Sequence, residues 1–412
     1  MNEFYVRAGW ISGEPVIGRC RINRDRGNEV ISFCYDPDWL DKHPSFILGP
    51  DVVNMPGWQY PDNNVFGFLE DCSPDRWGRK LLDRSRSGGS TVHRTLLASD
   101  YLLGVSDEGR MGGLRLSDPD GVYLASSEKH SIPPITDIRR LQDAVEKFEN
   151  DAHITDPYLS DLCAPGSSLG GARPKANIYD TDGSLWIAKF PSQKDDYDVG
   201  AFEMLTHELA AACGVSVPPA KTIYVKGKGT IYLTKRFDRF PDGKRIHFAS
   251  AMNMLGETDN SSRMSSYLDI AEVIEHYGLD PKADLLELWK RIAFGVCVGN
   301  ADDHLRNHGF LFAGDRLVLS PAYDINPNPF AKDLKLLIDY ESCEINIQTV
   351  LNAAEFFRVD KKTAYDTVLM IQKTIKDQIG YLRKKHNISS SDFASMSDAF
   401  REAYQDLGTS FC

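Results

Sequence analysis

The stretch that decides the fold is NADDHLRN, residues 300–307, which is followed by an apolar segment and then by Tyr323-Asp324. It offers carboxylates and a carboxamide, whose oxygens are the ligands that Mg²⁺ prefers in proteins. Phosphoryl transfer asks little more of a protein than such groups, which hold the ion against the phosphates and orient the attacking hydroxyl. The stretch therefore predicts a phosphotransferase active site.

Spacing assigns roles within this stretch. Four residues separate Asp302 from Asn307, the interval between the aspartate and the asparagine of protein-kinase catalytic loops, and Asp303 misses that interval by one. We therefore expect Asp302 to be the catalytic base, and Asn307 and Asp324 to hold the metal. His304 is assigned to the nucleotide-binding surroundings without a catalytic role, because a histidine beside such a loop more often fixes backbone than moves protons.

The flanking residues predict how the parts of the site come together. Apolar residues recur at helical spacing over 285–296, so a buried helix should lead into the loop. Two apolar runs within 310–319 surround a turn at 313–315, which is typical of a β-hairpin. Such a hairpin lets Asn307 and Asp324 face one ion. The alternative is a solvated acidic loop that caps a helix, but helix, loop, hairpin and Asp in series favour the metal site.

A nucleotide-binding part is predicted upstream. Residues 167–175, SSLGGARPK, form a loop of small residues whose glycines let backbone N–H groups approach phosphate and whose cations add positive charge. Strands are expected at 176–179 and 185–190. The second strand carries Lys189 in an apolar run, as does the kinase strand whose lysine pairs with nucleotide phosphates. Taken singly, the loop could be a hairpin turn and the lysine could snorkel from an edge strand.

Two further elements complete this part. A helix over 199–213 places Glu203 in its first turns, where it can reach back to Lys189 as the paired glutamate of kinases does. A strand over 231–239 occupies the place of the hinge, where adenine would bind backbone groups. That second assignment rests on position alone.

The chain resembles the HipA-type serine/threonine kinases, the toxin halves of bacterial toxin–antitoxin pairs. The strings that carry the resemblance are SSLGGARPKA, WIAKF, TKRFDR, GNADDHLRNHGFLF and LSPAYD, together with the N-terminal segments 33–40, 66–78 and 102–114. It extends over about residues 1 to 390. One departure is Lys235, which stands where many members carry an acidic residue before Arg-Phe.

The resemblance implies an α+β, two-lobed protein-kinase-like fold, with a β-rich N-terminal lobe that includes an N-terminal subdomain and an all-helical C-terminal lobe. It implies ATP and Mg²⁺ as cofactors, a protein substrate, autophosphorylation at Ser168, and a small HipB-like DNA-binding antitoxin through which any DNA contact is indirect. The expected nucleotide-binding residues are Ser168, Gly170, Gly171, Ala172, Arg173, Lys175, Lys189, Glu203, Lys235, Arg236, Phe237 and His304.

Composition sets bounds that agree with this interpretation. A chain of 412 residues with 42% hydrophobic content can build two sizeable cores. We expect an N-terminal subdomain over 1–125, a nucleotide-binding part over 126–240 and a helical lobe over 241–412, with late helices near 346–357, 360–385 and 390–407. The net charge of −12 argues against general nucleic-acid binding.

Other classes find little support in the sequence. The eight cysteines form no C-x-x-C pair, so neither zinc nor a disulfide framework is indicated. No stretch approaches the roughly 18 consecutive apolar residues that a membrane helix needs, so we expect a soluble, cytoplasmic protein. Two alternatives to a protein kinase stay open. One is a small-molecule phosphotransferase of the aminoglycoside type, whose loop has the same pattern, and the other is a catalytically silent kinase fold that serves as a binding module.

Overall fold

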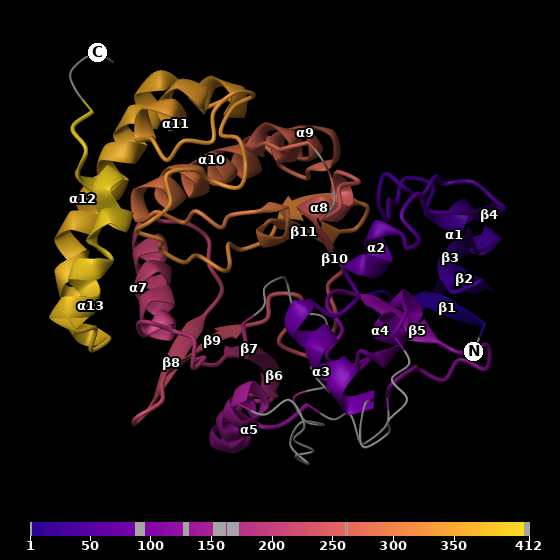
Figure 1. Cartoon of the computed structure of the whole chain (residues 1–412). Coiled ribbons are helices and arrows are strands. Elements are labelled where there is room, and N and C mark those ends of the chain that lie inside the picture. The colour runs from indigo at the N-terminus through magenta and orange to yellow at the C-terminus, as the bar shows by residue number, and fades with distance from the viewer. Residues whose placement is uncertain are drawn as a thin grey trace. The chain divides into compact units, whose positions relative to one another are not determined.

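The computed structural model describes residues 2–86, 95–126, 132–150, 162, 173–259, 261 and 263–407. Its contacts group the chain into two compact units (Figure 1). The first comprises residues 1–193, 235–258 and 311–315, and the second comprises 194–234, 259–310 and 316–412. Residues 241–258 and 311–315 thus group with the first unit, although the sequence assigns them to the helical lobe.

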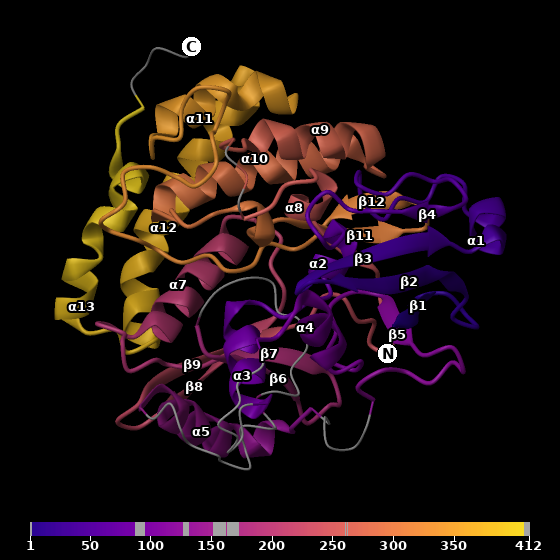
Figure 2. The same cartoon turned by 45° about the vertical axis from the view of Figure 1, so that its right-hand side comes forward.

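The first unit contains a five-stranded antiparallel sheet in the order β4-β3-β2-β1-β5 (Figure 2). Its strands are β1 (Glu3–Ala8), β2 (Val16–Asp25), β3 (Asn28–Tyr35), β4 (Trp58–Gln59) and β5 (Leu114–Ser117). Burial alternates along β1, where Phe4, Val6 and Ala8 are fully buried. This period of two shows that one face of the sheet packs on the core.

Helices and a second hairpin complete the first unit. The hairpin is β6 (Lys175–Tyr179) and β7 (Leu185–Lys189), paired antiparallel around a turn in which Gly183 has a φ of 78°. Both strands were predicted from the sequence. The remaining elements are α1 (Pro37–Lys42), α2 (Gly67–Glu70), α3 (Arg76–Arg86), α4 (Ala98–Gly104), the 3₁₀ helix η2 (Ile135–Asp137), α5 (Ile138–Asn150), β10 (Phe248–Ser250) and α8 (Ala251–Met254).

The second unit is mostly helical. Its elements are α7 (Val199–Ala212), β8 (Ala220–Val225), β9 (Gly229–Lys235, whose last residue groups with the first unit), α9 (Tyr267–Tyr277), α10 (Pro281–Val298), η3 (Leu305–Asn307), β12 (Arg316–Leu319), α11 (Ile347–Ala353), η4 (Ala354–Phe357), α12 (Lys361–Lys385), α13 (Ser390–Ser395) and η5 (Ser397–Tyr404). Along α12, residues spaced by three and four are buried, from Ala364 to Ile379. The late helices are confirmed within a few residues of their predicted bounds.

Helix α10 leads into residues 300–307, the predicted catalytic stretch. Asp280 accepts a hydrogen bond from the N–H of Ala283, and Pro281 occupies the first helical position, so the helix has a well-defined start. It ends at Gly299, which has a φ of 65°. A Cβ at Gly299 would lie 2.6 Å from the carbonyl oxygen of Ala399, so only glycine fits there. The loop therefore begins at a fixed position.

The mixed α and β content that was predicted is confirmed, with one correction. The segment 241–412 is not all-helical, because it contains β10, β11 (Gly309–Ala313) and β12. The last two are the strands that the apolar runs after the catalytic stretch predict. Along β12 and from Phe310 onward in β11, buried residues alternate with more accessible ones, which suits a pleated strand better than a helix.

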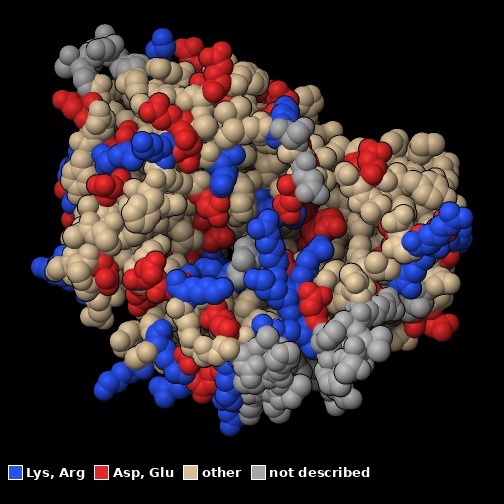
Figure 3. Space-filling model, in the orientation of Figure 1, with Lys and Arg blue, Asp and Glu red and all other residues tan. Residues whose placement is uncertain are grey.

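No helix of the described part of the chain is long and apolar enough to cross a membrane. Side chains of both signs of charge are spread over the face drawn in Figure 3, as expected for 47 basic and 59 acidic residues.

Candidate active site

The catalytic stretch lies in the second unit and is braced by its own residues. Asp302 is exposed, whereas Asn307 is only 5% exposed. The Asn307 side-chain amide donates a hydrogen bond to the backbone carbonyl of Asp302 at 3.2 Å. Its carbonyl oxygen, Oδ1, is buried and has no hydrogen-bond partner among the described residues. A buried, unpartnered oxygen is costly unless a ligand takes it up.

Asp303 differs from its neighbour Asp302. One carboxylate oxygen, Oδ2, accepts a hydrogen bond from the hydroxyl of Tyr267 at 2.6 Å and another from Nε2 of His308 at 3.1 Å. Burial alone would raise the pKa of Asp303, but His308 and Tyr267 together hold that pKa below its usual range. Asp303 is thus an ionised, half-buried acceptor, which supports the assignment of the base to Asp302.

Asp324 is held from two sides. Its backbone lies in the left-handed region, with a φ of 60°, which is uncommon for a residue other than glycine. The side-chain amide of Asn326 donates to Asp324 Oδ1 at 2.9 Å, and the N–H of Asn326 donates to Oδ1 of Asn300 at 3.0 Å. On the other side, the hydroxyl of Thr206 in α7 donates to the carbonyl of Ile325 at 2.6 Å. These contacts fix the Asp324 carboxylate relative to both the loop and α7.

The donor set suits a hard divalent cation. Asn307 offers its unpartnered amide oxygen and Asp324 a carboxylate, and Mg²⁺ is usually bound by one or two such groups with waters and phosphates completing the shell. The described residues contain no cluster of three or more His, Cys, Asp or Glu side chains, so a dedicated all-protein metal cage is not built there.

Other polar residues of the loop have structural partners. The Tyr323 hydroxyl donates to the backbone carbonyl of Arg306 at 2.7 Å, and the Arg306 guanidinium pairs with Asp259 at 3.1 Å. His304 is half-buried, and its Nδ1 has no hydrogen-bond partner in the described ranges. The structure places His304 within the loop, and its assignment to nucleotide binding remains a prediction.

Glu203 lies in α7 of the second unit and is 2% exposed. Burial raises the pKa of Tyr232, and the charges of Glu203 and Asp324 raise it further, so both carboxylates lie near this tyrosine. The Tyr232 hydroxyl forms a 3.0 Å hydrogen bond with Nδ1 of His207. Within the second unit, Glu203 of α7 and Asp324 therefore lie near the same tyrosine.

Two predicted phosphate-binding lysines lie opposite each other in the first unit. Lys175 on β6 and Lys189 on β7 are paired across the hairpin, so their side chains share one face. Lys189 is half-buried and lies on β7, within the strand predicted to carry it. Lys175 is only 6% exposed, and its ammonium lies 2.9 Å from the carboxylate of Asp75.

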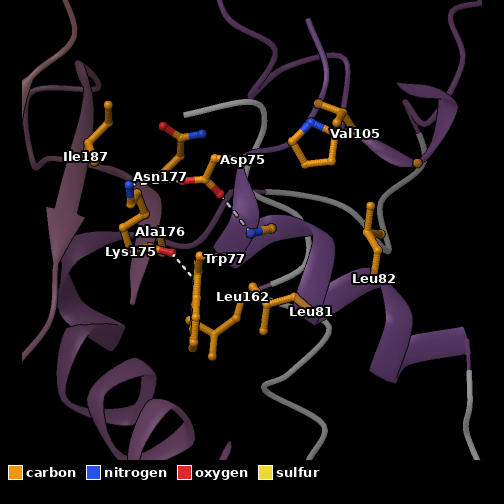
Figure 4. Close-up of a pocket in the computed structure, with 13 residues that line it drawn as sticks. Asp75, Trp77, Leu81, Leu82, Val105, Leu162, Lys175, Ala176, Asn177 and Ile187 are labelled. Atoms are coloured by element: carbon orange, nitrogen blue, oxygen red, sulfur yellow. Dashed lines mark hydrogen bonds and ion pairs between the residues drawn. The ribbon is translucent and has the colours of Figure 1, made fainter. Parts of the chain in front are cut away.

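Asp75 explains part of the N-terminal motif. Its other carboxylate oxygen accepts a hydrogen bond from the N–H of Gly78 at 2.8 Å, which caps the start of α3. The indole N–H of Trp77 donates to the carbonyl of Lys175 at 3.0 Å (Figure 4). Lys175 is therefore engaged in a buried ion pair beside the start of α3, and its assignment to nucleotide binding stays a prediction.

The segment predicted as the hinge is a buried charge network in the first unit. Arg236 donates to Asp238 and to the backbone carbonyls of Gly109 and Arg110, with its donors all engaged. Asp238 is fully buried and also accepts from Arg239 and from the N–H of Gly112. Burial alone would raise the pKa of Asp238, but the two guanidinium groups hold it well below its usual range.

This network engages the Arg236 guanidinium, and the assignment of Arg236 to nucleotide binding stays a prediction. Lys235 lies at the end of β9 and pairs loosely with Asp182 at 3.9 Å. The Phe237 ring packs near that of Phe248, with centroids 6.0 Å apart. The sequence did not reveal that residues 107–113 supply backbone carbonyls that accept hydrogen bonds from Arg236 and Arg239. The only available signal was the acid-rich and glycine-rich composition of that motif.

The Gly-rich loop falls mostly outside the described residues, and so do Ser168, Gly170, Gly171 and Ala172. Arg173 is the first described residue after it, and its guanidinium donates to the carbonyl of Phe190 at 3.2 Å.

Comparison with known proteins identifies relatives. The model of the HipA-like C-terminal domain family matches residues 167–385, which is more than half of the chain. "Putative kinase Y4mE" of Sinorhizobium fredii is 28% identical over 198 residues, covering 42% of this chain and 46% of that protein. "Putative kinase Y4dM" of the same organism is 30% identical over 158 residues, covering 35% of this chain and 37% of that protein. The chain thus spans less than half the length of these two relatives.

A solved structure supplies the fold. The HipA toxin–antitoxin complex of Shewanella oneidensis MR-1, with HipB and operator DNA, contains a chain that superposes with a TM-score of 0.70 at 17% sequence identity. The match covers 97% of this chain and 95% of that chain. At this identity the likeness establishes the fold, and the predicted fold class is confirmed.

Proposed function

The chain belongs to the HipA-like C-terminal domain family, and on that premise we propose that it is an ATP- and Mg²⁺-dependent serine/threonine protein kinase. The observation that carries the proposal is the pair of oxygen donors in the second unit. The Asn307 amide oxygen is buried without a partner among the described residues, and the Asp324 carboxylate is held by Asn326 in a strained backbone conformation.

Each residue has a separate task in the reaction. Asp302, which is exposed at the start of the loop, accepts the proton of the substrate hydroxyl as that oxygen attacks the γ-phosphorus; the bond from the γ-phosphorus to the bridging oxygen breaks, and ADP leaves. Asn307 and Asp324 would hold Mg²⁺, which would neutralise charge on the nucleotide phosphates. Lys189, on β7, is the residue proposed to bind nucleotide phosphates. Asp303, which is half-buried and hydrogen-bonded to Tyr267 and His308, stays ionised and takes no proton.

We further propose that the protein acts as a toxin restrained by a small HipB-like antitoxin. The support is the whole-chain fold likeness to the HipA of a HipA–HipB–operator complex, which covers the N-terminal part as well as the family-model region. In this proposal any DNA contact runs through the antitoxin, because a net charge of −12 leaves the chain poorly suited to bind phosphates itself.

Ser168 is proposed as the site of self-inactivation. A phosphate there adds about 1.5 to 2 negative charges to a loop whose amides must face the anionic oxygens of the nucleotide. Incubation with Mg-ATP followed by intact-mass measurement tests this step. We expect the wild type to gain one phosphate in the loop. The Asp302→Ala variant, incubated by itself, should gain none. Loop-phosphorylated protein that binds ATP as tightly as before would overturn it.

The whole proposal is tested by incubating the full chain with γ-labelled ATP and a bacterial lysate, followed by mapping of phosphorylated residues. Labelled serine or threonine on a protein is expected. Transfer only to added aminoglycosides would favour the small-molecule phosphotransferase. Intact ATP binding with no transfer to any acceptor would favour the silent binding module. Asp302→Ala serves as the matched control, since it should bind ATP and transfer nothing.

A further inference from the structure

Tyr267 lies far from the catalytic stretch in sequence, yet its hydroxyl donates a hydrogen bond to Asp303, the immediate neighbour of the expected base. It is 1% exposed and occupies the first position of α9. A buried phenol hydroxyl needs a partner, and a single carboxylate oxygen of Asp303 accepts both from Tyr267 at 2.6 Å and from His308 at 3.1 Å.

Several hydrogen bonds fix the backbone at Tyr267, at the start of α9. Ser266 caps α9 with its side chain, and the Asp269 carboxylate accepts a hydrogen bond from the N–H of Ser266 in a capping box. The N–H of Tyr267 donates to the carbonyl of Leu337 at 2.9 Å, and the N–H of Leu337 donates to the carbonyl of Ser265 at 3.0 Å. The phenol is thus mounted on a capped helix that is also bonded to the segment after Asp324.

His308 supports the same carboxylate from the other end of the loop. It follows Asn307 directly and is 3% exposed. Its ring meets the Tyr267 ring edge to face, with centroids 5.5 Å apart and an interplanar angle of 90°. The two buried rings and the half-buried Asp303 carboxylate therefore form one hydrogen-bonded unit, which we call the Tyr267 clamp.

Within the Tyr267 clamp, Tyr267 and His308 hold the carboxylate of Asp303, which directly follows Asp302 in the chain. Because Asn307 already holds the carbonyl of Asp302, the backbone at 302–303 is gripped on both sides, once by an amide and once by the clamp. An exposed carboxylate on so short a fixed segment samples few orientations. A base placed about 1 Å away from its working position can lose on the order of a hundredfold in rate.

We propose that Tyr267 is a positioning residue that sets the orientation of Asp302 through Asp303. The proposal rests on the kinase activity proposed above and extends it to a residue that the loop spacing does not single out. We expect its effect on the rate of phosphoryl transfer and not on ATP binding, because Tyr267 donates to Asp303, a residue with no assigned role in holding the metal or the nucleotide.

The test uses the full chain, γ-labelled ATP at varied concentration, and bacterial lysate proteins as acceptors. Tyr267→Phe removes only the hydroxyl and should lower the maximal rate roughly tenfold, with the KM for ATP unchanged. Tyr277→Phe, at the other end of α9 and 41% exposed, is the matched control and should behave as wild type.

Histidine variants separate positioning from packing. His308→Gln keeps an amide donor for Asp303 and should retain most of the rate, whereas His308→Leu should fall about as far as Tyr267→Phe. The double variant Tyr267→Phe/His308→Leu should be little slower than either single one, since both act through one carboxylate.

The outcomes distinguish two failures. A wild type that binds ATP and labels no protein overturns the proposed activity. A wild type that labels proteins while Tyr267→Phe stays within twofold of it overturns only the positioning role. The positioning role also fails if His308→Gln and His308→Leu are equally slow, or if the losses of the double variant multiply.

Discussion

Two highly charged segments of this chain differ in whether their buried polar atoms have hydrogen-bond partners. In the catalytic stretch, the Asn307 amide oxygen and a nitrogen of His304 are buried without hydrogen-bond partners among the described residues. In the segment 236–239 of the first unit, Arg236 and Asp238 meet carbonyls, amides and each other throughout. Unsatisfied buried groups are expensive, so they persist where a ligand completes them. Fully satisfied ones indicate a structural role.

The largest effect expected from this contrast is at Asp302. Replacement of Asp302 by Ala should reduce phosphoryl transfer by roughly a hundredfold to ten-thousandfold, with little change in stability because the side chain is exposed. Asp303→Ala should lose less activity and more stability. Transfer rates with labelled ATP and thermal unfolding of both variants provide the measurement. An inactive Asp303 variant beside an active Asp302 variant would shift the base by one residue and break the comparison.

The satisfied segment should respond in stability instead. Asp238→Ala leaves two guanidinium groups facing a buried, uncompensated position, and the free energy of unfolding should fall by about 3 to 5 kcal/mol. Urea denaturation measures this change. Lys244→Ala, which removes one partner of an exposed ion pair with Asp242, is the control and should leave stability as in wild type. A folded Asp238→Ala protein of normal stability that has lost ATP affinity would show that the segment serves the nucleotide after all.

Metal dependence sharpens the comparison further. Asn307→Ala and Asp324→Ala should weaken nucleotide binding by roughly tenfold when Mg²⁺ is present, and little when it is chelated, because these side chains reach the phosphates only through the ion. Lys189→Ala should weaken binding under both conditions. Calorimetric titrations with and without chelator distinguish the cases. Equal losses for all three variants in both conditions would remove the metal from the assignment.

His247 is one of several buried polar groups, unpartnered in the described part of the chain, that do not follow this rule. Both of its ring nitrogens are buried without described partners, yet it lies in the first unit between the rings of Trp10 and Phe312, at 4.6 and 4.5 Å. Burial lowers the pKa of His247 to about 3. The unfolded chain therefore binds a proton below its ordinary pKa of about 6.5 while the folded chain does not.

The consequence is acid lability. His247 should cost stability progressively as pH falls from about 6.5 toward 3, by up to roughly 1.4 kcal/mol per pH unit, and the penalty should level off below the folded pKa. His247→Phe removes this dependence while keeping the aromatic stack. Unfolding free energies of both proteins at pH 7, 5 and 4 test it. Parallel pH profiles would mean that the ring is hydrated and that its lack of a partner is only apparent.

Local patterns predicted the local structure well. Helix α10, the β6–β7 hairpin and the buried stripe of α12 follow from periodicity that the sequence displays directly. The interval from Asp302 to Asn307 was enough to assign roles within the loop, because it depends only on a short local stretch of chain. Pairing across long separations is different in kind. The partner of Asp303 is 36 positions away at Tyr267, and the partner of Lys175 is Asp75, a hundred positions upstream.

Those long-range choices could not be predicted because charge alone does not select a partner. Lys175 and Lys189 look equally suited to phosphate in the sequence, and only the approach of α3 makes one of them an ion-pair residue. Likewise, Arg236 follows a strand in a place where kinases bind adenine, and only the fold of 107–113 reveals that its donors are occupied. Tertiary packing decides which polar groups remain available for chemistry.

The close approach of Gly299 to Ala399 has a practical consequence for work with this chain. The 3₁₀ helix η5 is joined to α12, where the Gln372 side chain donates to the carbonyl of Glu402 at 2.8 Å, and to α11 through Glu402 and Ile347. Residues 397–404 therefore press against the point where the catalytic stretch leaves α10. A truncation that removes them would act as a lesion of the active site, although no residue of the site has been changed. Expression vectors and fusion partners should leave this segment intact.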